Sequence, residues 1–340
     1  MTPAIFGCSG PRLTADERAF FREADPAGYI LFARNCENPE QLRALTDDLR
    51  SLHGRERLLV SIDQEGGRVA RLRPPHWSPY PAGEAFDRLY TLAPASAIEA
   101  ARANAEAMAL ELAAMGITVT YHPPLDLRQP GAHDVIGDRA LGADPMQVAA
   151  IGRAILDGLE RGGVTGCIKH MPGHGRSMVD THKEVPTVRE SAAELESDIA
   201  PFRALSSARI GMTGHLIFPV WDADNPATLS PAIIRDIIRG EIGFEGLLLT
   251  DDIDMEALND TIPNRAARAI AAGCDIVLNC WAKMDDMRGI CAAVPALSEA
   301  ASARLDAALE GTQIADEIAS TQGELLAKRD ALLALTGGAA

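Results

Sequence analysis

Cysteine is scarce in this chain of 340 residues, and none of it is arranged as a metal or redox motif. The six cysteines include no Cys-x-x-Cys pair and no zinc-ligand spacing. Several lie in apolar, strand-like runs, which predicts reduced side chains in the core and a reducing compartment. They are Cys8, Cys36, Cys167, Cys274, Cys280 and Cys291.

Long apolar runs are also missing. No stretch approaches the roughly 18–20 apolar residues that a membrane-spanning helix needs. The amino terminus, Met-Thr-Pro-Ala-Ile-Phe-Gly-Cys, has neither the basic region nor the apolar stretch of a signal peptide. We therefore expect a cytoplasmic protein with no membrane partner.

Positive charge is outnumbered by negative charge. The chain has 32 Lys and Arg residues against 48 Asp and Glu residues, a net charge of −16. This balance argues against nucleic-acid binding, which needs a basic surface, and against docking on anionic lipid. A hydrophobic content of 47% and 29 glycines indicate instead a folded globular protein with a large core.

Apolar, strand-like runs alternate with amphipathic, helix-like stretches through most of the chain. The predicted strands are 4–7, 28–33, 58–63, 118–122, 164–170, 210–215, 246–251 and 275–280. The predicted helices are 14–24, 39–52, 95–115, 145–161, 191–207, 231–242, 264–272 and 288–309. Eight strands in strict βα alternation predict an α/β fold, a single (β/α)8 barrel of the TIM type.

We expect residues 1–340 to form one catalytic domain with a helical, Ala/Leu-rich tail at about 311–340, packed on the barrel or on a partner. A monomer is the expected state. A doubly wound sheet is the alternative fold, but no Gly-x-Gly-x-x-Gly opens a helix after the first strand.

The densest group of reactive side chains follows the fifth predicted strand. Residues 169–182 read Lys-His-Met-Pro-Gly-His-Gly-Arg-Ser-Met-Val-Asp-Thr-His. Reactive groups of a barrel gather at the carboxyl ends of its strands, because the loops there converge on one cleft. A packed core would have to provide a partner for each of these polar groups, so the cluster predicts a functional site.

Four other predicted strands also end in polar residues. These ends read 61–68 Ser-Ile-Asp-Gln-Glu-Gly-Gly-Arg, 121–126 Tyr-His-Pro-Pro-Leu-Asp, 213–215 Thr-Gly-His and 250–254 Thr-Asp-Asp-Ile-Asp. For His122, Asp126, Asp252 and Asp254, a role in capping or in supporting another side chain is as good an interpretation as a direct one. Together, the carboxylates, arginines and lysine suit a hydroxyl-rich substrate such as a sugar.

Two long segments resemble known sequence patterns. Lys169-His-Met-Pro-Gly-His-Gly with Asp180-Thr-His182 resembles the signature of family 3 glycoside hydrolases of the β-N-acetylglucosaminidase type. The segment from Ile237 to Asp251, ending Gly-Phe-Glu-Gly-Leu-Leu-Leu-Thr-Asp, is similar to that family's nucleophile pattern. Shorter matches are 63–68 Asp-Gln-Glu-Gly-Gly-Arg, 136–139 Ile-Gly-Asp-Arg and 225–230 Asn-Pro-Ala-Thr-Leu-Ser.

The resemblance, which runs from about residue 5 to residue 280, implies a set of roles. Asp251 would be the nucleophile and His182 the general acid/base, with Asp180 as its partner. The residues implied to hold the N-acetylglucosamine ring are Asp63, Arg71, Arg139, Lys169 and His170. No cofactor and no metal are implied.

The resemblance also implies a biological setting. The family's bacterial cytoplasmic members are single barrels that act in cell-wall recycling. They release N-acetylglucosamine from its disaccharide with anhydro-N-acetylmuramic acid, with or without a peptide stem. This chain departs from the pattern at Met171, where phenylalanine is more usual, and at Trp281-Ala-Lys283, which bears on the outer rim of the site.

The chemistry suits those residue types. Retaining glycosidases use a nucleophile and an acid/base on the two sides of the scissile bond. We expect Asp251 to be kept ionised by Lys169 or Arg139. Histidine exchanges protons at neutral pH, and Asp180, two residues before His182, lies on the same side of an extended loop, where it would orient the ring.

Three other functions remain possible from the residues alone. A metal-dependent barrel hydrolase would use His170, His174, His182 and His215 with Asp63 and Asp251. Against it, no His-x-His ends the first strand, and Lys169 would lie beside the metal. A phosphorylase would resolve the same covalent intermediate with phosphate. A non-catalytic sugar-binding barrel would not need both Asp251 and the Asp180–His182 pair.

Overall fold

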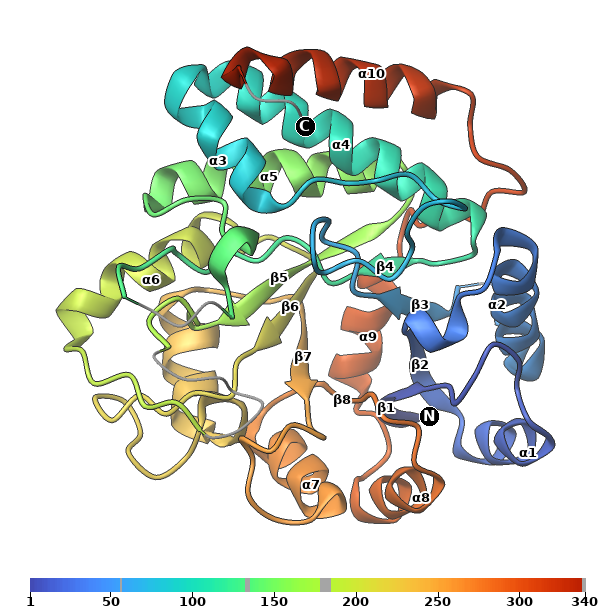
Figure 1. The fold of residues 1–340 in the computed structure, drawn as a ribbon. Helices are drawn as coiled ribbons and strands as arrows, with labels where there is room; N and C mark the ends of the chain where they lie inside the picture. The colour runs from blue at the N-terminus through green and yellow to red at the C-terminus, as the bar shows by residue number, and fades with distance from the viewer. Residues whose placement is uncertain (56, 132–134, 178–184, 338–340) are drawn as a thin grey trace.

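Eight parallel strands close into a barrel that is surrounded by helices (Figure 1). The computed structural model describes residues 1–55, 57–131, 135–177 and 185–337. Each strand pairs with the next, and β8 pairs with β1. The strands are β1 (Thr2–Gly7), β2 (Pro26–Leu31), β3 (Leu59–Ile62), β4 (Val119–Thr120), β5 (Thr165–Met171), β6 (Ile210–Thr213), β7 (Leu247–Asp252) and β8 (Ile276–Asn279). The predicted (β/α)8 barrel is confirmed.

The helices follow the strands in the predicted order. They are α1 (Ala15–Ala24), α2 (Pro39–His53), α3 (Gly83–Leu92), α4 (Pro94–Ala114), α5 (Pro145–Arg161), α6 (Ala192–Ala204), α7 (Ile262–Ala272), α8 (Met284–Ala293), α9 (Glu299–Ala308) and α10 (Thr321–Leu333). Thr14 caps α1 together with Glu17 in a reciprocal capping box, as the Thr-Ala-Asp-Glu sequence predicts.

Two helical predictions need correction, and one helix was missed. The stretch predicted as one helix over 288–309 forms two, α8 and α9, separated by a segment that contains Pro295, which lacks the N–H of a helix interior. The stretch predicted at 231–242 is a π-helix over Ile233–Glu241. Helix α3, between β3 and α4, was not predicted.

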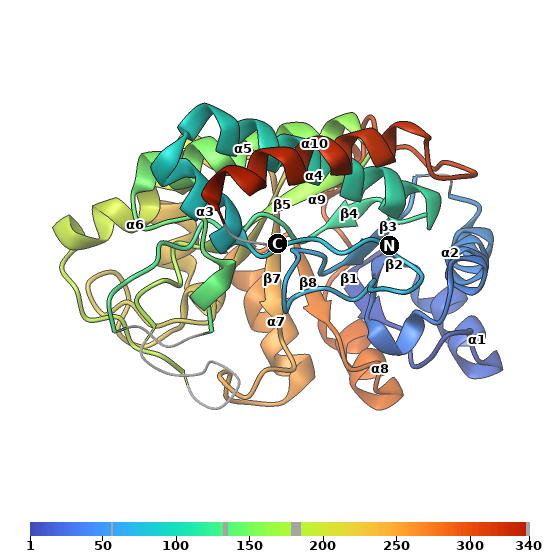
Figure 2. The same cartoon turned by 45° about the horizontal axis from the view of Figure 1, so that its top comes forward.

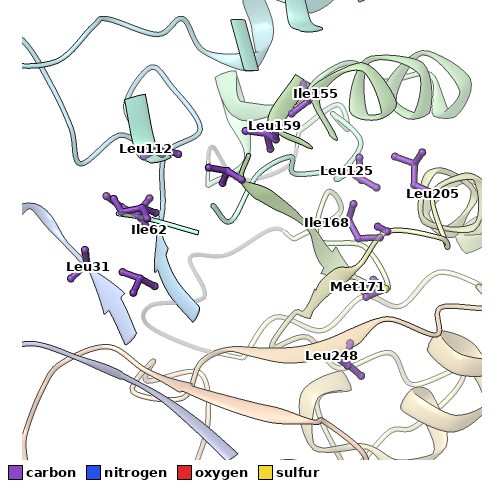
Figure 3. Packing of buried hydrophobic residues seen from close by; sticks show 14 of the residues in the cluster. Leu31, Ile62, Leu112, Leu125, Ile155, Leu159, Ile168, Met171, Leu205 and Leu248 are labelled. Atoms are coloured by element: carbon purple, nitrogen blue, oxygen red, sulfur yellow. The ribbon is translucent and has the colours of Figure 1, made fainter. Parts of the chain in front are cut away.

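Side chains of each strand alternate between the barrel interior and the helix layer. On β7, Leu247 and Leu249 belong to the interior cluster, and Leu248 belongs to the outer one. On β5, Cys167 faces inward and Ile168 outward. Figure 3 shows Leu248 and Ile168 among the residues that pack between strands and helices. This alternation fixes which residue at each strand end faces the barrel axis.

Two helices lie outside the regular βα ring. Leu305, Ala308 and Leu309 of the α9 region pack against the interior cluster, and the Thr165 hydroxyl at the start of β5 donates to the Ala308 carbonyl. Helix α9 therefore covers the amino-terminal end of the barrel. Helix α10 lies along α4 in both views (Figures 1 and 2). No helix in the described part of the chain has the length and apolar content needed to span a bilayer.

Candidate functional site

A cavity of about 220 Å³ opens at the carboxyl ends of the strands. It collects the charged ends of several strands, together with apolar residues from the same end of the barrel. Its lining comprises Phe32, Asp63, Val69, Arg71, Tyr121, Val135, Ile136, Arg139, Lys169, His170, His174, Met212, Asp251, Asp252, Met255, Leu278 and Cys280.

Six of the eight residues singled out from the sequence line this one cavity. They are Asp63, Arg71, Arg139, Lys169, His170 and Asp251. The other two, Asp180 and His182, lie outside the described residues. The segments that carry the six are up to about 190 residues apart in the sequence, and the closed barrel brings them together.

Strand alternation and one bulge explain how four of these side chains reach the cavity. Asp251 continues the inward series of Leu247 and Leu249, and Asp63 continues that of Leu59. On β5 the pairing register with β6 shifts by one residue between Ile168 and Met171. A bulge of this kind re-aims side chains. The consecutive residues Lys169 and His170 therefore both line the cavity.

Lys169 and Arg139 share a buried carboxylate that sequence reasoning missed. Glu65 accepts from Arg139 Nε at 2.8 Å and Nη2 at 2.7 Å, and it lies 2.7 Å from Lys169 Nζ. Burial opposes ionisation, but the two cations hold the pKa of Glu65 well below its usual range. Lys169 also lies 3.2 Å from Asp63, which pairs with Arg71 at 3.0 Å. In this one cluster three cations, Lys169, Arg139 and Arg71, thus pair with two carboxylates, Glu65 and Asp63.

A second carboxylate positions the histidines. Asp126 Oδ2 lies 2.7 Å from His170 Nδ1, and Asp126 Oδ1 accepts the backbone N–H of His174 at 2.7 Å. Burial raises the pKa of Asp126, but the His170 and His174 rings outweigh burial and lower it to about 2. His174 Nδ1 is buried without a hydrogen-bond partner among the described residues, and burial lowers the pKa of this ring to about 4.

Asp251 differs from these two carboxylates in having no cationic partner at salt-bridge distance in the described structure. It accepts one hydrogen bond, from the Asp252 N–H at 2.8 Å. Burial raises its pKa, but the His170 and His215 rings and that N–H outweigh burial and lower it. Lys169 contributes less than these groups, and Arg139 pairs with Glu65. The expectation that Lys169 or Arg139 keeps Asp251 ionised is therefore revised: Lys169 contributes, but the two histidine rings and the Asp252 N–H lower the pKa more.

The turn after β7 is held by further polar contacts. Burial and the neighbouring Asp254 raise the pKa of Asp252 to about 8. His215 bridges Thr228 Oγ1 at 2.8 Å and the Asp252 carbonyl at 2.9 Å. Asp254 accepts from the Asn279 side chain and from the backbone at the end of β8. For Asp254, and for the Asp126 described above, the structure favours the supporting role.

One residue, Glu65, and one pairing, that of Asp126 with His170, were missed from the sequence because their signals were weak. Glu65 lies two positions after Asp63, so period-two alternation would have placed both on the inner face. The ends of β4 and β5 are neighbours in a barrel, but no spacing rule pairs Asp126 with His170. Within the described residues, no group of three or more His, Cys, Asp or Glu side chains is arranged to hold a metal ion.

Three comparisons agree with this geometry. The family described as "Glycosyl hydrolase family 3 N terminal domain" matches residues 7–313. A protein named Beta-hexosaminidase from Bordetella avium is 38% identical over 283 residues, covering 82% of this chain and 80% of its own. One of the same name from Alkalilimnicola ehrlichii is 40% identical over 283 residues, with the same coverages.

A solved structure is similar over nearly the whole chain. NagZ from Neisseria gonorrhoeae, in complex with N-trifluoroacetyl-D-glucosamine, superposes with a TM-score of 0.88 at 31% identity, and the match covers 99% of this chain and 98% of that one. A family 3 β-N-acetylglucosaminidase from Paenibacillus matches with a TM-score of 0.81 at 30% identity, over 99% of this chain and 62% of that chain.

Proposed function

The chain belongs to glycosyl hydrolase family 3, and from that membership we propose that it is a retaining exo-β-N-acetylglucosaminidase of cell-wall recycling. The general activity that the family and the relatives support is that of a glycoside hydrolase of the β-hexosaminidase kind. For the substrate, we propose terminal β-linked N-acetylglucosamine in its disaccharide with anhydro-N-acetylmuramic acid, with or without a peptide stem. The enzyme would release the N-acetylglucosamine. A cytoplasmic location is part of this proposal.

One observation carries the proposal. Asp251 lines the cavity with its pKa lowered, yet it accepts only one hydrogen bond from the described residues, from a backbone N–H. Glu65 and Asp126, by contrast, are committed to cationic or imidazole partners. An ionised carboxylate with unused lone pairs is what a nucleophile requires.

In the proposed reaction, a carboxylate oxygen of Asp251 attacks the anomeric carbon of the bound sugar. The glycosidic C–O bond breaks as His182 gives its proton to the departing oxygen, leaving a covalent glycosyl ester. Water then attacks the same carbon, His182 takes a proton from it, and the ester bond breaks. Asp251 is regenerated, and two inversions give net retention of the β configuration.

The other residues are proposed to bind and orient the sugar. The carboxylate of Asp63 and the cations Arg71, Lys169 and Arg139 offer acceptors and donors for hydroxyl and acetamido groups. His170, whose Nδ1 is bonded to Asp126, presents Nε2 as its remaining polar atom. Asp180 is proposed to fix the tautomer of His182 and to stabilise its imidazolium form.

Release of a chromogenic phenol from its β-N-acetylglucosaminide tests the proposal, in phosphate-free buffer with a chelator present. We expect hydrolysis by the wild type and none above background by Asp251→Ala. Proton NMR of the fresh product should show the β anomer first. Loss of activity with the chelator would favour the metal-dependent hydrolase, and sugar 1-phosphate formed on adding phosphate would favour the phosphorylase.

A leaving-group series tests His182. Its replacement by alanine should reduce cleavage of a natural disaccharide by far more than cleavage of a dinitrophenyl glycoside, because an acidic phenol departs without protonation. Added azide should partly restore turnover of the activated substrate by replacing the water that needs a base. An equal loss for both substrates would contradict the acid/base assignment.

A further inference from the structure

Trp281 stands exposed where the chain leaves the barrel after β8. The preceding residue, Cys280, lines the cavity, whereas Trp281 is 61% exposed. The chain has three tryptophans, and Trp77 is only 6% exposed. An exposed indole next to a residue that lines a cavity offers a large, flat apolar surface on which a bound ligand can pack.

The backbone of this segment is held firmly. Asp254 Oδ2 accepts the N–H of Cys280 at 2.9 Å and that of Trp281 at 3.1 Å, as well as the Asn279 side chain at 2.9 Å. The turn continues through Ala282 in a left-handed conformation, with φ of 56°. Trp281 is therefore presented from a fixed turn, which lowers the entropy cost of binding a ligand there.

The adjoining edge of the cavity is aromatic and cationic. Phe32, which follows β2, lines the cavity, and the guanidinium groups of Arg34 and Arg71 lie 4.7 and 5.2 Å from its ring centroid. Arg34 also donates to the carbonyl of Cys280. This contact links the Phe32 edge to the turn that carries Trp281.

Lys283 adds a positive charge that forms no ion pair with a described residue. Its Nζ lies 4.9 Å from the centroid of the Trp281 ring, and it makes no ion pair with any residue that the structure describes. The chain has only four lysines and a net charge of −16. An unpaired ammonium beside an exposed indole fits a ligand with an apolar face and an anionic group.

We propose that Trp281 and Lys283 form the binding platform for the aglycone, taking a second sugar ring that bears a carboxylate. The ring's C–H face packs on the indole, and its carboxylate pairs with the ammonium. The proposal rests on the proposed function, because the first sugar must occupy the cavity for the second to reach this edge. It assigns aglycone selectivity to the segment at which this chain departs from its family's pattern.

The test compares three substrates that share one N-acetylglucosaminyl group. The first is the β-fluoride, whose leaving group has no ring. The second is N,N′-diacetylchitobiose, with an uncharged second sugar, and the third is the disaccharide with anhydro-N-acetylmuramic acid, whose second sugar carries a carboxylate. Each is measured with the wild type, Trp281→Ala, Trp281→Phe and Lys283→Gln. Lys328→Gln, on α10 and paired with Glu99, is the matched control.

We expect Trp281→Ala to lower kcat/KM about tenfold for both disaccharides, a loss typical of one aromatic contact, and to leave the fluoride unchanged. Trp281→Phe should recover most of that loss. Lys283→Gln should lower kcat/KM roughly threefold for the carboxylate-bearing disaccharide alone, and about 0.5 M salt should abolish the difference. Lys328→Gln should change none of the three.

Two results would overturn the platform. One is unchanged disaccharide cleavage by Trp281→Ala, and the other is an equal loss on the fluoride, which would indicate a structural effect. If the wild type does not hydrolyse the fluoride, the proposed function itself fails, and the platform with it.

Discussion

Three carboxylates near the cavity differ in the contacts that they make, because their neighbours differ. Glu65 is saturated by Arg139 and Lys169, and Asp126 is bonded to His170 and to a backbone N–H. Both are therefore supports for other side chains. Asp251 receives a single backbone hydrogen bond from the described residues, which leaves lone pairs without a described donor, as its proposed role as nucleophile requires.

Replacing Asp126 by Asn tests its positioning role. The amide group would offer an N–H where His170 Nδ1 now meets a carboxylate oxygen, so the ring would have to reverse its donor and acceptor nitrogens. We expect kcat/KM to fall about 10- to 100-fold, mainly through KM, since the contact that orients His170, a ring proposed to bind the sugar, is lost.

Steady-state kinetics with the chromogenic glycoside, together with the melting temperature, check this. Asp198→Asn is a matched control, because that carboxylate, on α6, is also buried but accepts a hydrogen bond from Arg176 rather than contacting a cavity histidine. Equal kinetic losses in the two variants would show that Asp126 acts only through stability.

The raised pKa of Asp252 predicts that the stability of the fold depends on pH. Burial and Asp254 raise its pKa from an ordinary 3.8 to about 8, so the folded protein keeps a proton that the unfolded chain releases. The favourable contribution of Asp252 to the free energy of unfolding is complete below about pH 4 and is lost as the pH rises towards 8. Asp252→Asn keeps the oxygen that accepts the Asp254 N–H but cannot ionise.

Between pH 5 and pH 9 the melting temperature of Asp252→Asn should therefore fall less than that of the wild type, by about 2–4 °C. Differential scanning calorimetry at four pH values in this range measures it. Every other titrating group is common to both proteins, so parallel curves would show that the Asp252 carboxyl does not take up a proton on folding.

At the scale of elements, capping residues and prolines in the sequence predicted where individual helices begin. The Thr14 capping box begins α1 as the sequence predicts, and α5 begins at the predicted Pro145, where the Asp144 side chain caps it. Helix α3 was missed because its N-cap residue, Ala82, which precedes Gly83, provides no side-chain cap. The stretch at 231–242 has a helical apolar period, which does not distinguish i+4 from i+5 hydrogen bonding.

Helix α10 lies beyond residue 313, where the family match ends, yet buried polar contacts attach it to the barrel. Arg329, 6% exposed, donates to Asn104 Oδ1 and to the Pro79 carbonyl, both at 3.1 Å. Its guanidinium also lies 5.9 Å from the centroid of the Tyr80 ring. Two acceptors and one aromatic face therefore depend on this side chain.

Arg329→Ala should lower the free energy of unfolding by about 2–4 kcal/mol, because it leaves buried acceptors without a donor and removes packing. Arg88→Ala is the matched control, since Arg88 is 61% exposed and pairs with Glu84 on the same helix. Its effect should stay within about 0.5 kcal/mol. Urea unfolding followed by circular dichroism compares them, and equal midpoints would refute the buried attachment.

At the scale of the whole molecule, the barrel could be predicted because each βα unit carries its own signal. Eight such units leave one closed arrangement, and strand alternation then turns Asp63 and Asp251 inward. Contacts between side chains of different loops cannot be predicted from local sequence. The contacts of Glu65 with Arg139, and of Asp126 with His170, join residues 74 and 44 positions apart. Only the closed barrel brings these partners together.

Ligand binding should stabilise the whole barrel, because the proposed sugar site draws on strands across it. At a hundred times its Kd, N-acetylglucosamine should stabilise the folded state by about 2.7 kcal/mol, and the melting temperature should rise by several degrees. Glucose at the same concentration should raise it less, since it lacks the acetamido group. Arg71→Ala should weaken the response to N-acetylglucosamine, because Arg71 pairs with Asp63 at the cavity wall.

Differential scanning fluorimetry over a concentration series of each sugar measures these shifts. Arg88→Ala, remote from the cavity lining, should respond as the wild type does. Equal shifts with glucose would remove the preference for the N-acetyl sugar while leaving the glycosidase chemistry intact. No shift with either sugar, in a protein that still hydrolyses the chromogenic glycoside, would mean that the cavity holds the sugar tightly only in the transition state.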